Sequence, residues 1–339
     1  MNEPTAILPD KLVMIDPGKP ARVKQIAVIS GKGGTGKTSL VASFAALSRN
    51  CVLADCDVDA ADLHLLLEPH VVRREPFTGG KRARIRTEQC TACGKCQEQC
   101  RFDAIILDGP GNGPVEKTFR VDPLACEGCG VCAWLCPERA IDLSPVVNGE
   151  WFISETRFGP MVHAKLGVGG ENSGKLVTTV RMNAERVAQE HGLNLLLIDG
   201  SPGIGCPVIA SVNGVDLVLV VTEPTLSGLH DLERVADLTW HFGVPTMVCV
   251  NKWDLNPQLR KQIELRARER RLGWAGTIRY DQAVTEAQIQ GKTIVEHREN
   301  GCAADICNIW AKLKARLKED VELKGAPLLK PGQKGSKIV

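Results

Sequence analysis

The chain has 339 residues, enough for more than one average domain and a large buried core. Its formal net charge is +2 and aromatic residues make up 4% of it, which argues against a surface that binds nucleic acid. No run approaches the ~20 apolar residues that span a bilayer, and no signal peptide is evident. The 14 cysteines therefore indicate metal ligands in a reducing compartment, and we expect a cytoplasmic protein without stable membrane insertion.

The first predicted elements follow an N-terminal extension. Residues 1–23 hold four prolines and no periodicity, so we expect a surface or disordered segment. Residues 24–86 are then expected to begin a nucleotide-binding domain. Gln25 to Ser30 (QIAVIS) reads as a buried strand, and apolar residues recur at helical spacing from Ser39 to Arg49.

The loop between that strand and that helix has the pattern of a P-loop, GKGGTGKT. Its glycines let backbone N–H groups surround phosphate oxygens, while the helix directs its positive end at them. Lys37 can reach the β and γ phosphates, and the Thr38 hydroxyl can bind Mg²⁺. The segment predicted to contact ATP comprises Gly31, Lys32, Gly33, Gly34, Thr35, Gly36, Lys37, Thr38 and Ser39. A glycine-rich turn without a ligand is the alternative.

A second buried strand, beginning at Cys51, ends in acidic residues. Asp55, Asp57 and Asp59 follow it at the carboxyl end, where open α/β sheets bind their ligands. Asp59 and Asp62 can instead cap the next helix.

A basic run lies between Arg73 and Arg86. We interpret it as a solvated rim, with a docking site for an acidic partner as the alternative. The run contains Arg73, Arg74, Lys81, Arg82, Arg84 and Arg86.

Residues 87–145 contain two copies of the spacing C-x2-C-x2-C-x3-C, which is typical of bacterial two-cluster ferredoxins. In that pattern three cysteines of one run and the fourth of the other hold each [4Fe–4S] cluster. The first predicted ligand set is Cys90, Cys93, Cys96 and Cys136, and the second is Cys126, Cys129, Cys132 and Cys100. Zinc is the alternative metal, although its cysteines usually come as two separated pairs. The ferredoxin unit is predicted to be inserted into the nucleotide-binding domain.

Residues 146–323 are expected to complete the nucleotide-binding domain. Apolar runs that alternate with helical patterns predict a parallel sheet covered on both faces. One of these strands terminates at Asp199, in the arrangement of a Walker B acid beside Mg²⁺. The last helix, from about Ala303 to Leu323, has an apolar stripe that is better suited to core packing than to membrane anchoring. Residues 324–339 are expected to form a flexible tail.

Together these motifs resemble the MinD/ParA superfamily of P-loop ATPases, in the form that contains an inserted two-cluster ferredoxin domain. The resemblance implies an α/β P-loop NTPase fold with helices on both faces of the sheet and an inserted α+β domain. It implies that Lys32 crosses a homodimer interface in the ATP state, with a solvated lysine as the alternative. It further implies that Asp57 orients the attacking water, that Asp199 begins a γ-phosphate switch, and that Asn251 contacts adenine. A plain loop asparagine is the alternative for Asn251.

Three functions remain open under this resemblance. ATP hydrolysis can gate electron transfer from two [4Fe–4S] clusters to an unknown protein acceptor, or it can drive assembly of a metal cofactor in a client protein. A spatial organiser with a redox switch is the third. Cys206, seven residues after Asp199, is either a buried packing residue or a thiol that senses the nucleotide switch.

Overall fold

The computed structural model describes residues 22–48, 50–58, 61–167 and 172–319. Almost all of the expected N-terminal extension and the whole C-terminal tail lie outside these residues.

A nine-stranded sheet forms the centre of the molecule, in the order β11-β10-β9-β1-β8-β2-β7-β6-β3. From β11 to β7 neighbouring strands are parallel, because helices connect them across the faces of the sheet. Their apolar runs are buried on both faces, as the sequence predicts. The strands are β1 (Lys24–Ser30), β2 (Val52–Asp55), β7 (Gly159–Leu166), β8 (Leu195–Pro202), β9 (Leu217–Thr222), β10 (Thr246–Asn251) and β11 (Gly273–Ile278).

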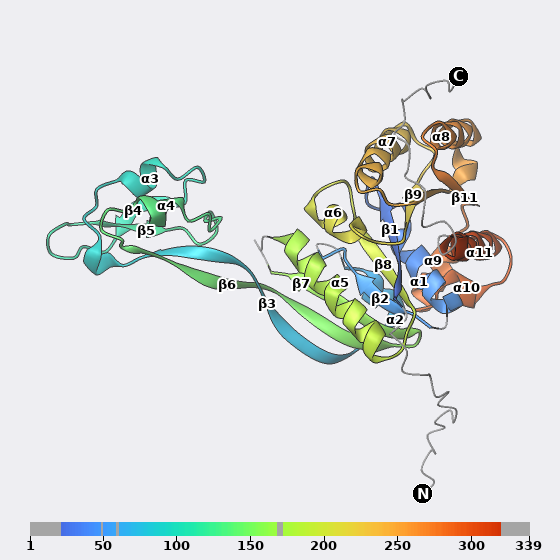
Figure 1. Cartoon of the computed structure of the whole chain (residues 1–339), viewed down its shortest axis with the longest axis horizontal. Helices are drawn as coiled ribbons and strands as arrows, with labels where there is room; N and C mark the ends of the chain where they lie inside the picture. Colours follow the sequence, from blue (N-terminus) through green and yellow to red (C-terminus); the bar gives the residue numbers. More distant parts are fainter. Residues whose placement is uncertain (1–21, 49, 59–60, 168–171, 320–339) are drawn as a thin grey trace, which may run out of the picture.

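Helices cover both faces of this sheet, and a separate apolar core lies between the sheet and the helices on each face (Figure 1). One face is covered by α5 (Ser173–Glu190), α6 (Cys206–Val212), α7 (Leu226–His241) and α8 (Pro257–Glu269). The other is covered by α1 (Lys37–Ser48), α2 (Leu63–Leu67), α9 (Ala283–Ile289), α10 (Ile294–His297) and α11 (Cys302–Glu319). The predicted two-sided α/β architecture is confirmed, and the apolar stripe of α11 packs in the second core.

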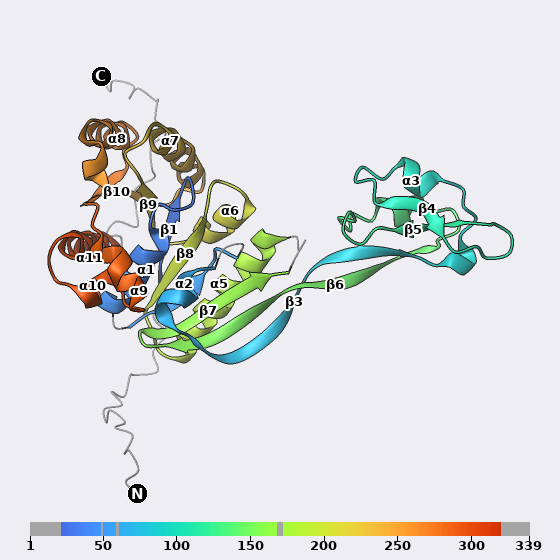
Figure 2. The ribbon, with the colours of Figure 1, turned by 180° about the vertical axis from the view of Figure 1, so that it is seen from behind.

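The edge of the sheet continues into a long antiparallel ribbon of two strands. β3 (His70–Ile85) and β6 (Ile141–Thr156) remain paired from His70 opposite Glu155 to Ile85 opposite Ile141. Figures 1 and 2 show that this ribbon leaves the sheet beside β7 and carries a small lobe at its far end. Residue 145, the expected end of the insertion, lies within β6.

The lobe has its own small core, in which cysteines pack with Ala83, Ile105, Phe119 and Ile141. It contains α3 (Lys95–Glu98), the hairpin of β4 (Ile105–Gly109) and β5 (Thr118–Val121), and α4 (Val131–Leu135). Residues 110–117, which are rich in glycine and proline, form the turn of this hairpin.

Candidate nucleotide site and cysteine cavities

The P-loop lies between β1 and α1 and has the backbone conformation that its glycines permit. Gly34 and Gly36 have φ angles of 76° and 90°, in the left-handed region. The Asn251 side chain donates from Nδ2 to the carbonyl oxygen of Thr35 at 2.8 Å. A Cβ on Gly36 would lie only 2.6 Å from that Nδ2 atom, so this close approach requires glycine.

Two buried carboxylates lie next to the P-loop. Asp55 at the end of β2 is the register partner of Asp199 in β8, and both are almost fully buried. Burial raises the pKa of Asp199 to about 7, although the Lys37 ammonium and the Thr38 hydroxyl oppose the rise. Burial and the Asp199 carboxylate raise the pKa of Asp55 as well.

Several oxygen atoms at this point lack a hydrogen-bond partner among the described residues. They are Oγ1 of Thr35, Oδ2 of Asp55 and both carboxylate oxygens of Asp199. Buried oxygens without partners are costly unless a cation or water satisfies them. The donor set therefore fits Mg²⁺, a cation that prefers oxygen ligands.

β8 continues to Pro202, so Asp199 lies within its strand rather than at its end.

An open cleft of about 770 Å³ lies beside the P-loop. Asp57 lines it and is half-buried, and its backbone N–H donates to Oδ1 of Asp55 at 3.2 Å. Asp62 also lines the cleft and precedes α2, but its side chain makes no capping hydrogen bond. In the same cleft, Gln288 of α9 donates from Nε2 to Oγ of Ser39 at 2.9 Å. Asp59 lies outside the described residues.

Lys32 is held by its own chain. Its Nζ lies 3.1 Å from Oε2 of Glu223, the residue that follows β9. Lys252 pairs with Oε1 of the same carboxylate at 2.7 Å. Burial raises the pKa of Glu223, but hydrogen bonds from Lys252 and Lys32 outweigh it and leave this pKa below its ordinary value. Sequence reasoning missed Glu223, although an acid directly after a buried strand was a usable signal.

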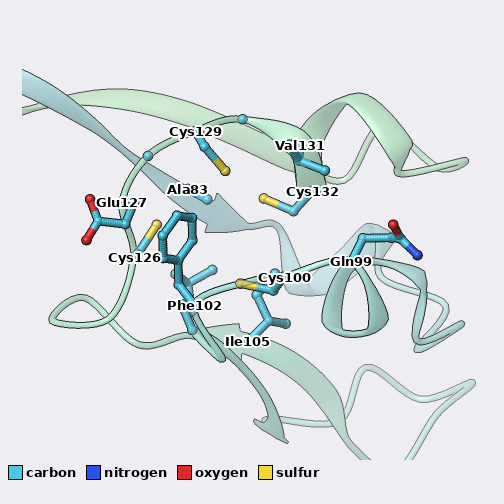
Figure 3. A pocket seen from close by; sticks show the side chains of 14 residues that line it. Ala83, Gln99, Cys100, Phe102, Ile105, Cys126, Glu127, Cys129, Val131 and Cys132 are labelled. Carbon is cyan, nitrogen blue, oxygen red and sulfur yellow. The ribbon is translucent and has the colours of Figure 1, made fainter.

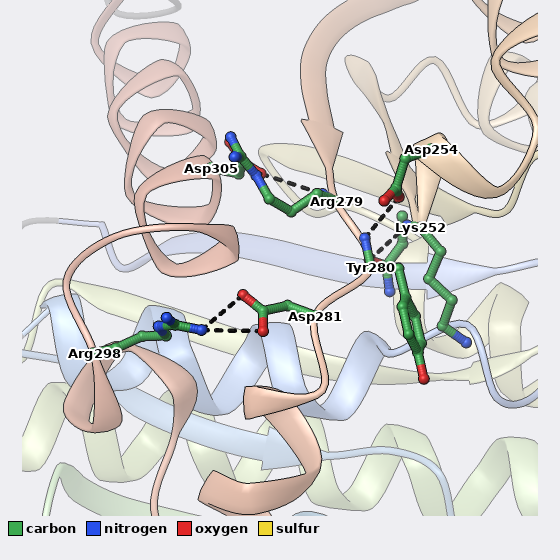
Figure 4. Close-up of polar contacts among 8 residues, drawn as sticks. Lys252, Asp254, Arg279, Tyr280, Asp281, Arg298 and Asp305 are labelled. Atoms are coloured by element: carbon green, nitrogen blue, oxygen red, sulfur yellow. Dashed lines mark hydrogen bonds and ion pairs between the residues drawn. The ribbon is translucent and has the colours of Figure 1, made fainter.

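Polar contacts fix the segment that follows β11 (Figure 4). Asp254 accepts from the Tyr280 backbone N–H at 2.7 Å. Arg279 pairs with Asp305, and Arg298 pairs with Asp281, through two hydrogen bonds each at 2.7 to 3.1 Å.

Asn251 already uses both ends of its amide. Besides the Nδ2 contact to Thr35, its Oδ1 accepts from the backbone N–H of Lys252 at 2.9 Å. One Nδ2 hydrogen remains for a base, so the expected contact of Asn251 with adenine stays a prediction.

The eight cysteines of the lobe surround two cavities in the predicted grouping. One cavity is lined by Cys90, Cys93, Cys96 and Cys136, and the other by Cys100, Cys126, Cys129 and Cys132. Figure 3 shows the second cavity, with Phe102 and Glu127 beside the sulfur atoms. Among the described residues, no three His, Cys, Asp or Glu side chains converge closely enough to hold a single metal ion.

The chemistry of these thiols fits iron–sulfur ligation. Burial raises the pKa of Cys96 to about 11, and burial also raises the pKa of Cys132, with neighbouring thiols adding to each rise. A cationic cluster core offsets this cost, because thiolates bind iron directly. The backbone N–H of Ala140 donates to Sγ of Cys136 at 3.3 Å, a contact of the kind that tunes cluster potentials.

The basic run lies along the ribbon and is partly neutralised there. Arg73 pairs with Glu75, Arg74 with Glu150, and Arg86 with Asp142. These pairs, on exposed strands, agree with the solvated interpretation.

Cys206 is exposed rather than buried. It is the first residue of α6. A Cβ atom added to Gly174 would lie 3.1 Å from the Cβ atom of Cys206. The interpretation as a buried packing residue is therefore wrong, and a role in sensing the nucleotide stays a prediction.

None of the described helices is long and apolar enough to cross a membrane.

Comparison with known proteins covers both parts of the chain. Residues 26–294 match the family model of the CobQ/CobB/MinD/ParA nucleotide binding domain. The chain is 35% identical over 244 residues to an uncharacterized protein of Methanocaldococcus jannaschii, a match covering 69% of this chain and 80% of that protein. It is 36% identical over 85 residues to pyruvate synthase subunit PorD of Thermotoga maritima, covering 24% of this chain and 77% of that subunit.

Solved structures share the fold. The cell division ATPase MinD of Pyrococcus furiosus matches with a TM-score of 0.51 and 16% identity, over 86% of this chain and 98% of that one. MinD of Pyrococcus horikoshii, complexed with Mg-ADP, matches with a TM-score of 0.52 and 15% identity, over 89% of this chain and 99% of that one.

Proposed function

This chain belongs to the CobQ/CobB/MinD/ParA nucleotide-binding domain family, and we propose that it couples ATP binding and hydrolysis to electron transfer through two [4Fe–4S] clusters. The MinD/ParA members are P-loop ATPases, and the relatives with ferredoxin-like segments support an inserted iron–sulfur domain here. The predicted resemblance to MinD/ParA ATPases with such a domain is thus confirmed.

The nucleotide site supplies what phosphoryl transfer needs. The P-loop amides and Lys37 bind and orient the phosphates, and Asp57, which lines the same cleft, holds the attacking water. Mg²⁺, when bound by Thr38 and Asp199, neutralises phosphate charge. Lys32, once released from Glu223, reaches the nucleotide of a second copy, so the ATP state is a homodimer.

The cysteine cavities support two clusters rather than zinc. Each is lined by four cysteines, three from one run and one from the other. A cluster binds each cysteine at a different iron, so its ligands spread around a cavity, whereas zinc draws four thiolates to ~2.3 Å from one ion.

The single observation that supports coupling between the nucleotide site and the clusters is that the ribbon is continuous with the sheet of the nucleotide-binding domain. β7 pairs with β2, which ends at Asp55, and the part of β6 from Gly149 to Thr156 pairs with β7, while the other end of β6, at Ile141, lies in the lobe. A movement of β2 on nucleotide exchange therefore acts on strands that lead directly to the cysteines.

A second function is favoured by the exposure of two ligands. Cys93 and Cys129 are exposed, one at each cavity, so a cluster there is open to exchange with another protein. Under this alternative, ATP hydrolysis drives delivery of a cluster or metal to a client.

Anaerobic purification and activity assays test the proposal. We expect about eight irons and eight sulfides per chain, together with slow Mg²⁺-dependent ATP hydrolysis. Lys37→Ala should lose nucleotide binding and keep its iron, and Cys96→Ser should lose iron and keep nucleotide binding. Zinc without sulfide would contradict the proposal. ATP-dependent reduction of an acceptor favours electron transfer, whereas ATP-dependent iron transfer to an apo-protein favours assembly.

A further inference from the structure

The lobe consists of two halves that repeat each other in backbone conformation as well as in sequence. Ala92 and Gly128, each one residue before the second cysteine of its run, have φ angles of 52° and 64°. Asp103 and Arg139, each three residues after the fourth cysteine, both have φ angles of 50°. Positive φ is uncommon outside glycine, so its recurrence at matching positions shows that the two halves share one local structure.

The side chains around the two cavities differ in a consistent way at four matching positions. In the first half these positions hold Glu88, Lys95, Glu98 and Glu138, all exposed, of which Lys95 and Glu138 line the cavity of Cys90, Cys93, Cys96 and Cys136. In the second half they hold Leu124, Val131, Trp134 and Phe102. Val131 and Phe102 line the cavity of Cys100, Cys126, Cys129 and Cys132, and Trp134 lies three residues after Val131 on the same side of α4. We call Leu124, Val131, Trp134 and Phe102 the apolar patch.

The apolar patch is exposed to solvent. Trp134 and Leu124 are each 83% exposed, and Phe102 and Val131 are also exposed while lining the cavity (Figure 3). The first half shows that this local structure tolerates charged residues at all four positions. Folding of the lobe therefore does not require the apolar residues, and exposed apolar clusters of this kind mark interaction sites.

The charge of the lobe indicates the chemistry of the partner. Residues 81–142, which include the end of β3 that packs in the lobe, contain nine acids and nine bases, so the thiolates that bind two [4Fe–4S] clusters leave the lobe with a net negative charge. Glu127 lies at the edge of the same cavity. Interfaces combine an apolar centre with a polar rim, and opposite charges accelerate encounter.

We propose that the apolar patch is the docking site for a one-electron carrier protein with an apolar contact surface and a basic rim. This inference rests on the proposed function and specifies where the electron leaves the protein. One electron leaves the reduced cluster held by Cys100, Cys126, Cys129 and Cys132 and enters the cofactor of the carrier, so the cluster is oxidised as the carrier is reduced.

Electron transfer to a basic protein probe tests the proposal. The protein is reduced with dithionite, separated from the remaining dithionite, and mixed with excess oxidised cytochrome c, a basic one-electron haem protein, and in parallel with duroquinone, a small neutral acceptor. The test variant is Val131→Gln/Trp134→Gln. The control is Lys95→Gln/Glu98→Gln, which changes the matching positions of the other half and, like the test variant, leaves the net charge unaltered.

The test variant should reduce cytochrome c with a second-order rate constant lower by about tenfold or more, the loss typical of truncating an aromatic anchor. Its iron content and its rate with duroquinone should match the wild type, and the control should match in all three measurements. Equal loss in both variants, equal loss with both acceptors, or no loss would overturn the proposal. The proposal would also be overturned if the nucleotide-free wild type were a dimer and the test variant a monomer. In that case a second copy of the chain would cover the apolar patch. A wild type that reduces neither acceptor would instead refute the proposed electron transfer.

Discussion

Lys32 of the P-loop and Glu223 after β9 form an ion pair within one chain, with Nζ 3.1 Å from Oε2. The lysine that is expected to reach the nucleotide of a second copy is thus already engaged. Under the proposed function dimerisation breaks this contact, so the ion pair and the dimer compete for the same ammonium group.

Glu223→Gln should therefore favour the ATP-dependent dimer. A part-exposed ion pair is worth about 1 kcal/mol at most, so the ATP concentration for half-maximal dimerisation should fall by up to about fivefold. Light scattering of the Asp57→Ala protein, which should retain ATP, measures this shift. Lys32→Ala should suppress the dimer, and Lys252→Ala, which leaves the Lys32 pair intact, should not promote it. A dimer that forms equally in all variants would contradict the competition.

Asp57→Ala should retain nucleotide binding and lose turnover. Asp57 lines the cleft but is not part of the P-loop, so its removal leaves the phosphate contacts of the loop in place. The rate of phosphate release should fall by about 100-fold or more, as is typical when a group that positions or activates the nucleophile is lost. Asp62→Asn, a change at a second acid of the same cleft, serves as the control and should hydrolyse ATP normally. A normal rate in Asp57→Ala would remove Asp57 from the mechanism.

The buried Asp199 should make the stability of the metal-free protein depend on pH. Its pKa is about 7 in the folded chain, whereas an unfolded aspartate has a pKa of about 3.9. Between these values the folded state binds a proton that the unfolded state lacks. The resulting stabilisation is fully present below the lower value and is lost as pH rises through 7. Asp199 alone should lower the free energy of unfolding by up to about 1.4 kcal/mol per pH unit in this window, and Asp55, whose pKa is also raised, should add to this fall.

Urea unfolding in EDTA at pH 5.5 to 8, followed by tryptophan fluorescence, measures this dependence. Asp199→Asn should show a flatter profile because the titrating group is gone. Identical profiles for the two proteins would show that Asp199 does not titrate in this range.

Arg157 should connect the nucleotide cleft to the ribbon. It lies in the turn between β6 and β7, and its guanidinium donates to both oxygens of Glu296 at 3.1 and 3.0 Å and to the carbonyl oxygen of Gly291 at 2.9 Å. These acceptors follow α9, whose Gln288 contacts Ser39 beside the P-loop.

Arg157→Gln should keep the wild-type hydrolysis rate and lose much of the ATP-induced change in amide hydrogen exchange along β6. Arg74→Gln, which breaks the exposed pair with Glu150 on the same ribbon, is the matched control and should respond as the wild type does. Full retention of the response in Arg157→Gln would exclude this route.

The sheet and the cysteine grouping could be predicted from sequence because each depends on a local pattern. Runs such as residues 217–221 are apolar throughout, and the spacing of the eight cysteines specifies which of them share a cavity. The ribbon could not be predicted in this way. β3 contains Pro76, Gly79 and Gly80, and most of its residues are exposed, so no alternation of apolar and polar residues marks it as a strand.

The contacts within the nucleotide site also escaped prediction, because they join residues far apart in the chain. Asp55 and Asp199 meet only because β2 and β8 are neighbours in the sheet. Likewise, Glu223 meets Lys32 because β9 lies beside β1. The order of these strands in the sequence does not show that they are neighbours in the sheet.

The midpoint potential of the clusters, titrated anaerobically and followed by electron paramagnetic resonance, tests the coupling most directly. The measurement compares Mg·ADP with Mg·ATP in the Asp57→Ala protein, with Lys37→Ala as the control that binds neither. Coupling predicts a nucleotide-dependent shift on the order of 60 mV, equivalent to a tenfold change in the equilibrium constant of a one-electron centre, and no shift in the control. Equal potentials with both nucleotides, in a protein that binds both, would contradict it.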